Sequence, residues 1–233
     1  MNNHVYEIYR NIMSDNPKVD KNYLSHILNH HAAFWNHDLI SQNDEDGEHD
    51  AEGDRACLQS FLDDFSDKFD DRTKTILCNA MEINISLIKR TFERLCNKCN
   101  VTLCNGDSHI YNFMIPLKRN DSPLIIDFQF WGEGIGTGDL AHLTRVNFSK
   151  QQQKDFQLSL VEHYYKSLKK YGVTGYSWED CLRDYRTSVA SMVLIPLWQY
   201  AGFGLKYEEW SSALQGLIYN YEYLDCDELY RLI

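Results

Sequence analysis

Apolar residues recur every three or four positions along most of this chain, a period typical of helices that bury one face. The clearest repeat runs from Leu77 to Leu95, where the steps between apolar positions are four, four, three, four and three. The pattern predicts helices over residues 20–36, 58–65, 77–95 and 207–223, and two more that begin at Ser149 and Ser177.

Local signals predict where some of these helices begin and end. Ser149, followed three positions later by Gln152, resembles a capping box, in which the two side chains satisfy backbone N–H groups at a helix start. Gly172 is a typical stop signal for the helix that follows. In the next helix we expect a kink at Pro196, because proline lacks the N–H group that the helical ladder needs.

In the middle of the chain the helical period gives way to short apolar runs. VTLC at 101–104, FMIP at 113–116 and LIIDF at 124–128 predict strands, since turn-forming polar segments separate them. The glycine-rich GEGIGTG at 132–138 is expected to be the loop after the third strand.

These elements predict an α+β fold that is mostly α, a helical bundle with a small β insert. We expect a single domain over residues 1–233, with 1–20 as a lead-in. In the segment 43–54, seven of twelve residues are Asp or Glu. Charge repulsion should keep this segment an exposed loop, which would be either solvated and disordered or a cation-attracting rim.

The acidic composition narrows the range of partners. The chain has 23 Lys plus Arg against 34 Asp plus Glu, a formal net charge of −11. Such a surface repels nucleic acid and anionic membranes and favours cationic or metal-bound partners. The sequence start lacks a secretory signal, no apolar stretch is long enough for a membrane span, and the seven cysteines lack disulfide-framework spacing. We therefore expect a cytoplasmic protein that binds neither nucleic acid nor membrane.

The residues best suited to chemistry lie in the segment of short strands. Asp107 and Asn112 are five positions apart on one loop, Asp127 follows the third strand, and Asp139 stands in a GDLA segment. Phosphoryl transfer from ATP requires a carboxylate that accepts the proton of the attacking hydroxyl and oxygen ligands that hold Mg²⁺. The residues fit this chemistry, and the other reading is that they are loop and cap residues of an ordinary helical domain.

The same segment resembles the catalytic core of the aminoglycoside phosphotransferase and choline or ecdysteroid kinase-like superfamily, a protein-kinase-like group. The matching motifs are GDSHIYN at 106–112, IDFQ at 126–129 and GDLAHL at 138–143. LSHILNHHAAFW at 24–35 is similar to the helix that follows the hinge between the two lobes of these enzymes. The resemblance covers nearly all of the chain and implies the C-terminal catalytic lobe, with the catalytic loop on the β insert.

Residue roles follow from the resemblance. Asp107 would be the catalytic base, and Asn112 and Asp127 would be the Mg²⁺ ligands that hold the phosphates of ATP. His109 would line the loop as part of the cofactor site. Asp139 would support the loop through hydrogen bonds.

Two departures from the family pattern bear on activity. Asn105 stands where the family usually has a histidine that braces the loop, and its amide can replace one hydrogen bond but not the volume. The residues before Leu24 show no glycine-rich flap or strand pattern, so we expect the N-terminal nucleotide-binding lobe to be absent from this chain. An exposed, partly apolar surface near Tyr6 to Leu28 would then favour self-association or a separate small-lobe partner.

The function expected is ATP-dependent phosphotransfer to a hydroxyl of a small molecule. Acidity favours an amine-bearing acceptor, such as an aminoglycoside or a choline-like compound, and neutral alcohols stay open. The alternative is a non-catalytic remnant or a truncated form of such a kinase that acts as a binding or regulatory protein.

Other conspicuous residues are assigned structural roles. Cys96 and Cys99 lack the second pair that a zinc site usually has, so we favour helix-end thiols. His30 and His31 are expected to be packing residues. Four tryptophans could build an aromatic pocket, but we expect most of them in the core: Trp131, Trp178, Trp198 and Trp210.

Overall fold

The structure is a computed structural model that describes residues 23–38, 40, 49–114, 124–127 and 129–233. The described residues form two compact units, each with buried apolar side chains of its own. The first unit takes its residues from Met1–Gln42 and Arg94–Tyr185, and the second unit from Asn43–Glu93 and Arg186–Ile233. No helix in these described ranges is apolar over a stretch long enough to cross a lipid bilayer.

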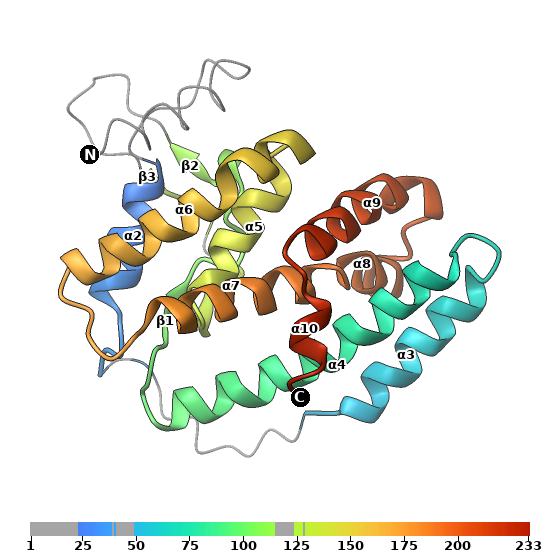
Figure 1. Ribbon diagram of the computed structural model, residues 1–233, viewed down its shortest axis with the longest axis horizontal. Helices are drawn as coiled ribbons and strands as arrows, with labels where there is room; N and C mark the ends of the chain where they lie inside the picture. Colours follow the sequence, from blue (N-terminus) through green and yellow to red (C-terminus); the bar gives the residue numbers. More distant parts are fainter. Residues whose placement is uncertain (1–22, 39, 41–48, 115–123, 128) are drawn as a thin grey trace. The chain divides into compact units, whose positions relative to one another are not determined.

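The first unit combines helices with short strands (Figure 1). Strand β1 pairs antiparallel with β4, and Thr102 lies opposite Gly134. Strand β2 pairs antiparallel with β3, and Phe113 lies opposite Ile125. Along the chain the elements are α2 (Tyr23–Ala33), β1 (Thr102–Cys104), the 3-10 turn η1 (Ile110–Asn112), β2 (Phe113–Met114), β3 (Leu124–Ile125), β4 (Gly132–Gly134), α5 (Thr137–Asn147), α6 (Lys150–Lys170) and the start of α7 (Trp178–Met192).

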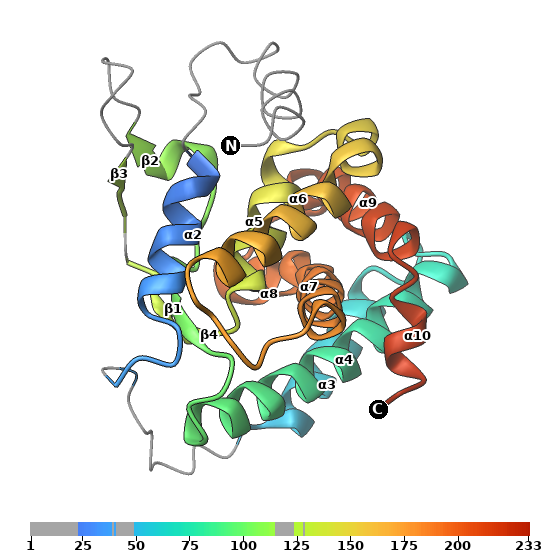
Figure 2. The same ribbon diagram turned by 60° about the vertical axis from the view of Figure 1, so that its left-hand side comes forward.

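Helix α2 organises the core of the first unit. It packs against β1, β3 and α6 (Figure 2). Ile27 and Leu28 of α2 are buried, as are Leu160 and Val161 of α6. The surface that we expected to be exposed near Tyr6 to Leu28 is therefore covered at its last two positions, and residues 6–22 lie outside the described residues.

The predicted ends of α6 are confirmed. Ser149 accepts a hydrogen bond from the Gln152 N–H at 3.3 Å, and Gln152 accepts one from the Ser149 N–H at 2.9 Å, which completes the capping box. Two residues after the helix, Gly172 adopts a φ of 92°, a left-handed conformation that glycine reaches without strain.

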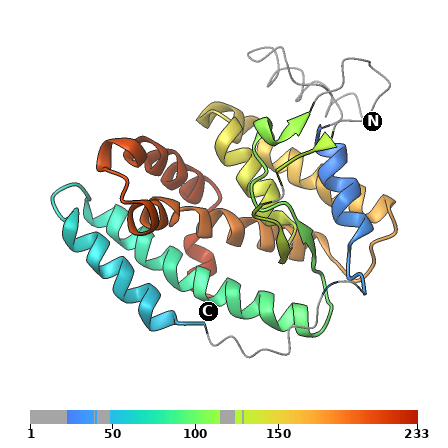
Figure 3. The ribbon, with the colours of Figure 1, turned by 180° about the vertical axis from the view of Figure 1, so that it is seen from behind.

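The described residues of the second unit form helices joined by turns, with no strand among them. Helices α3 and α4 lie side by side (Figure 3), and a two-pronged ion pair joins them, with both Arg55–Glu82 contacts at 2.7 Å. Helix α3 begins where Asp50 accepts a hydrogen bond from the Gly53 N–H at 2.8 Å. The elements are α3 (Ala51–Asp64), α4 (Asp71–Cys96, whose last turn belongs to the first unit), the end of α7, α8 (Ile195–Phe203), α9 (Tyr207–Tyr223) and α10 (Asp227–Tyr230).

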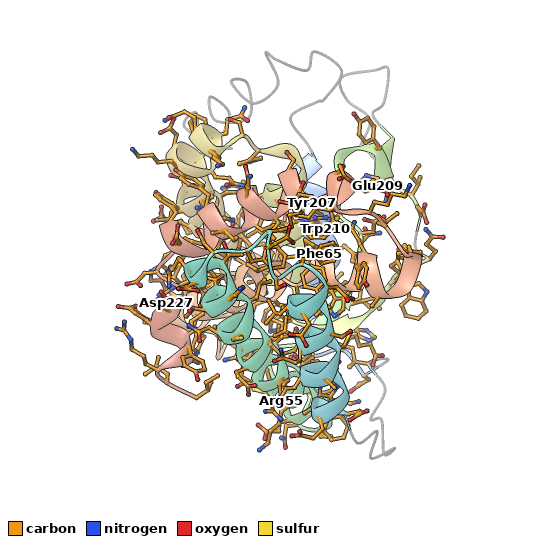
Figure 4. The ribbon with its side chains drawn as sticks, turned by 90° about the vertical axis from the view of Figure 1, so that its right-hand side faces the viewer. Arg55, Phe65, Tyr207, Glu209, Trp210 and Asp227 are labelled. Atoms are coloured by element: carbon orange, nitrogen blue, oxygen red, sulfur yellow. The ribbon has the colours of Figure 1, made fainter. Side chains whose placement is uncertain are left out.

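A cluster of aromatic rings forms the centre of the second unit (Figure 4). The Trp210 ring lies 5.2 Å from Phe61 and 5.0 Å from Phe65, between ring centroids. Its indole N–H donates a hydrogen bond to the Leu205 carbonyl at 3.3 Å, so the buried polar end of the ring is satisfied. The cluster contains Phe61, Phe65, Phe69, Tyr200, Tyr207 and Trp210.

The mostly helical α+β class is confirmed, but several local predictions were wrong. Helix α3 starts at Ala51, inside the acidic segment that we expected to be a loop, because Asp50 caps it. Residues 132–134 form strand β4 rather than a loop. Pro196 does not kink a continuous helix: α7 ends at Met192, and Pro196 lies in the first turn of α8, where its missing N–H costs nothing.

The two tryptophans of the second unit provide a test of the aromatic core. Trp210 is fully buried, whereas Trp198 is 41% exposed. We expect Trp210→Ala to lower the free energy of unfolding by about 3–5 kcal/mol. Trp198→Ala should change it by less than about 1 kcal/mol. Urea denaturation followed by circular dichroism measures both, and equal losses for the two variants would contradict the assignment of the core.

Candidate active site

The loop after β1 is held by the buried carboxylate of Asp139, near the start of α5. Its Oδ2 accepts a hydrogen bond from the Asn105 N–H at 2.7 Å, and its Oδ1 accepts one from the Gly106 N–H at 2.9 Å. Burial alone would raise the pKa of this carboxyl, but the His31 contact and the two backbone N–H groups outweigh it, so the pKa is lowered. An ionised Asp139 thus fixes the backbone just before Asp107.

Asp139 is held in turn by a histidine of α2. The His31 Nε2 lies 3.0 Å from Asp139 Oδ2, and its Nδ1 lies 2.9 Å from the Tyr164 hydroxyl on α6. Burial raises the pKa of Tyr164 well above its usual range, so its hydroxyl keeps its proton and donates to Nδ1. His31 is buried, as expected of a packing residue, and it also links α2, α5 and α6 through both ring nitrogens.

Gly106 brings a second loop against the first. Its φ is 80°, and a Cβ at this position would lie 2.1 Å from the Phe130 carbonyl oxygen. Only glycine allows this close approach in this conformation. The segment that follows β3 therefore packs directly on the loop that carries Asp107.

Asn105 also bridges the two loops. Its Nδ2 donates a hydrogen bond to the Asp127 carbonyl at 3.3 Å, and its Oδ1 accepts one from the Asp107 N–H at 3.2 Å. Asn105 is buried, and its Oδ1 accepts a third hydrogen bond, from the Ser108 hydroxyl at 3.4 Å.

Asp107 and Asn112 are brought together by the 3-10 turn η1. The buried Asn112 donates from Nδ2 to the Asp107 carbonyl at 2.9 Å and to Asp107 Oδ2 at 3.2 Å. The His109 Nε2 lies 3.3 Å from the same carboxylate oxygen. The Asp107 side chain is 23% exposed, so a substrate hydroxyl can reach it.

Asp127 lies at the exposed end of the site. It follows β3 with a φ of 58°, a left-handed conformation that costs a non-glycine residue energy and often occurs at functional sites. Its Oδ1 accepts a weak hydrogen bond from the Gln129 N–H at 3.4 Å. Its main chain is bonded to Asn105, but no described side chain bridges its carboxylate to Asp107 or Asn112. The oxygen atoms of Asn112 and Asp127 match the hard ligands that Mg²⁺ prefers.

Two residues near Asp107 were missed from the sequence. The His142 Nε2 lies 3.6 Å from Asp107 Oδ1, and the Arg145 guanidinium donates a hydrogen bond to the same nitrogen at 3.1 Å. Burial, followed by the charge of Arg145, lowers the pKa of His142 to about 4, so the ring is neutral at pH 7. The sequence spacing could have identified them. Asp139, His142 and Arg145 are three positions apart in turn, which places them on one face of a helix.

Among the described residues, Cys96 and Cys99 belong to no group of three or more potential metal ligands. Cys96 and Cys99 are exposed free thiols. Cys104 instead lies near His31 and Asp139, with ligand atoms within 4.8 Å of one another. Burial raises the pKa of the Cys104 thiol well above its usual range, and hydrogen bonds already occupy the other two residues. We assign this group to the support of the loop rather than to a metal.

A large hollow lies elsewhere and does not coincide with these residues. It has a volume of about 840 Å³ and lies on the second unit between α3, α4 and the C-terminal residues. Its walls are side chains such as Leu58, Met81 and Ile85, with Arg55 and Glu82 at one side. None of the residues expected to carry chemistry lines it, so we locate the candidate active site on the loops of the first unit.

Comparison with known families agrees with this location. Residues 23–173 match the model of the ecdysteroid kinase-like family, and this chain therefore belongs to that family. The family lies within the protein-kinase-like superfamily and indicates a kinase-like phosphotransferase. The aminoglycoside phosphotransferase part of the resemblance has no counterpart in this match. No curated protein and no solved structure matches the chain.

The support of the loop by Asp139 can be tested through stability. Asp139→Asn removes the buried negative charge that His31, Asn105 and Gly106 contact. We expect the free energy of unfolding to fall by about 3 kcal/mol at pH 7. The folded pKa lies below the ordinary value of 3.8. The difference between wild type and variant should therefore be full above about pH 4 and shrink as the pH falls through the folded value.

The matched control for this test is Asp155→Asn, an exposed carboxylate of α6 that accepts a hydrogen bond from Gln151 one turn earlier. It should change stability by less than about 0.5 kcal/mol at every pH. Urea unfolding at pH 7 and at a series of pH values below 3.8, continued until Asp139 of the folded protein is protonated, gives the comparison. A loss for Asp139→Asn that does not depend on pH would show that the ionised form is not what holds the loop.

Proposed function

We propose that this protein transfers the γ-phosphoryl group of ATP to a hydroxyl of a small molecule, with Asp107 as the base. The observation that carries the proposal is the loop itself. A buried, ionised Asp139 fixes the backbone before Asp107, and Asn112 orients the Asp107 carboxylate, which stays accessible. A family indicative of phosphotransfer supports the same reading.

The reaction assigned to these residues converts the acceptor hydroxyl into a phosphate ester. The acceptor oxygen forms a bond to the γ-phosphorus while the bond from that phosphorus to the β,γ-bridging oxygen breaks. The electron pair of the broken bond leaves with ADP, and the hydroxyl proton passes to the Asp107 carboxylate. The Asn112 amide holds the carboxylate in place by donating to Oδ2.

Asn112 and Asp127 would hold Mg²⁺, and His109 would complete the nucleotide side of the loop. The ion would supply positive charge that offsets the charge of the phosphates. The strained backbone of Asp127, stabilised by the hydrogen bond from Asn105 to its carbonyl, supports a role that goes beyond ending a strand.

Two features support different acceptor classes. The net charge of −11 favours an amine-bearing alcohol. Exposed aromatic residues lie on the two loops of the site, Tyr111 beside Asn112 and Phe130 and Trp131 after Asp127, with exposed fractions of 79%, 60% and 57%. Such rings favour an acceptor with an apolar ring system, because they can bury its faces. We favour the apolar class, since these side chains lie at the site and the net charge belongs to the whole chain.

A transfer assay tests the function. The full chain is incubated with Mg²⁺, ATP and a panel that includes an ecdysteroid, choline and an aminoglycoside, and the phosphorylated acceptor is identified by mass spectrometry. We expect Asp107→Asn to lower kcat by about 10²-fold or more, because the variant cannot accept the proton. Asp155→Asn is the control. Normal turnover of Asp107→Asn would remove Asp107 from the role of base, and a wild type inactive on every acceptor would favour a non-catalytic binding protein.

The metal role of Asp127 has its own test. Asp127→Ala should abolish the Mg²⁺ dependence of nucleotide binding in isothermal titration calorimetry. It should cost less than about 1 kcal/mol of stability, because the side chain is exposed. An unchanged response to Mg²⁺ together with a large fall in melting temperature would make Asp127 a structural residue instead.

A further inference from the structure

Arg145 is a half-buried cation close to the proposed base. Its guanidinium donates to His142 Nε2 at 3.1 Å, and that nitrogen lies 3.6 Å from Asp107 Oδ1. Burial lowers the pKa of Arg145 while the charge of Asp107 opposes that shift, and an arginine in this position stays protonated at pH 7. The positive charge therefore persists beside the site.

No carboxylate among the described residues forms an ion pair with Arg145. Another arginine of the first unit shows the usual arrangement: Arg94 meets the buried Asp184 with both terminal nitrogens, at 2.6 and 3.2 Å. Placing a cation in a partly desolvated position without such a partner costs free energy. An anion that binds at this position would recover that cost.

Two buried donors of these side chains have no acceptor in the described part of the chain. One is Arg145 Nε and the other is His142 Nδ1. A guanidinium can only donate, so His142 Nε2 accepts from Arg145 and the proton of the neutral ring sits on Nδ1. Buried donors without acceptors are rare in folded proteins and call for an explanation such as a ligand.

We propose that Arg145 binds the phosphoryl group beside Asp107, with His142 as the positioning residue that orients the guanidinium. The inference rests on the proposed phosphotransfer. A phosphoryl group presents several charged oxygens, which the planar fork of arginine can hold with parallel hydrogen bonds. Held there, Arg145 would stabilise the negative charge of the group as its bond to ADP breaks.

Two sources could supply the phosphoryl oxyanion, the γ-position of the nucleotide or a phosphate group on the acceptor. The geometry favours the γ-position, because the transferred group must come within bonding distance of the hydroxyl that Asp107 activates. The shared chemistry is a tetrahedral phosphate next to Asp107, and inorganic phosphate is therefore the probe.

The test is to titrate the full chain with inorganic phosphate and to measure the binding by isothermal titration calorimetry. We expect Arg145→Gln to weaken phosphate binding roughly tenfold or more, the effect of losing a hydrogen bond from a charged group. Arg145→Lys should retain part of the affinity. Arg183→Gln, which removes an exposed arginine paired with Asp180 on α7, should bind as wild type does. If wild type does not bind phosphate, or Arg145→Gln binds it unchanged, the proposal is overturned.

Two substitutions test whether His142 orients the Arg145 guanidinium. His142→Gln keeps an oxygen that can accept from Arg145 and should preserve most of the phosphate affinity, whereas His142→Leu should lose it in part. Equal affinities for these two variants would exclude His142 as the positioning residue. Thermal melts of all variants identify any loss of affinity that comes from unfolding.

Competition experiments identify the source of the phosphate. A non-hydrolysable ATP analogue with Mg²⁺ should displace inorganic phosphate, and ADP with Mg²⁺ should leave it bound. If neither nucleotide displaces it, the site belongs to a phosphate group on the acceptor and the γ-position assignment is wrong.

Asp107→Asn distinguishes this proposal from the proposed function. The substitution removes the negative charge next to the site, so phosphate should bind at least as tightly while transfer is lost. If Asp107→Asn loses transfer but Arg145→Gln binds phosphate as wild type does, the proposed function stands and the role of Arg145 in phosphate binding is rejected. Phosphate binding that requires Arg145 in a protein without transfer activity would support the site and reject the function.

Discussion

The candidate active site depends on one buried carboxylate. Asp139 accepts hydrogen bonds from two consecutive backbone N–H groups of the loop before Asp107 and from His31, whose other nitrogen faces Tyr164. A charge in this position is stable only while all of these donors remain in place. The candidate catalytic loop and the helices α2, α5 and α6 therefore stabilise one another, and the proposed base is positioned by the same interaction that helps to hold the first unit together.

The helices were predictable because their information is local. Apolar spacing located α3, α4 and α9, and the Ser149–Gln152 pair fixed the start of α6, since a capping box is formed by residues three positions apart. The errors occur where a partner distant in sequence decides. The glycine-rich residues of β4 become a strand only because they pair with β1, thirty positions earlier. The period of the apolar residues also cannot distinguish one kinked helix from two helices. The break before Pro196 was therefore not predicted.

The site was predictable in its motifs and not in its connections. Spacing and resemblance pointed to Asp107, Asn112, Asp127 and Asp139, but His31 joins Asp139 across 108 positions and no local pattern predicts that contact. Asn105 shows why a departure from a motif has to be judged in three dimensions. From the sequence its amide was expected to replace one hydrogen bond of the histidine, whereas in the structure the amide is buried and bonds to both loops.

The close approach of Gly106 to the Phe130 carbonyl has a consequence for how this sequence can vary over time. The contact uses a main-chain oxygen, so any residue at 130 supplies it, and the exposed ring of Phe130 is free to be exchanged as acceptors change. Position 106 has no such freedom, since even a methyl group would collide there. Substitutions can thus change the exposed side chains around the site one at a time while the distance between its two loops stays the same.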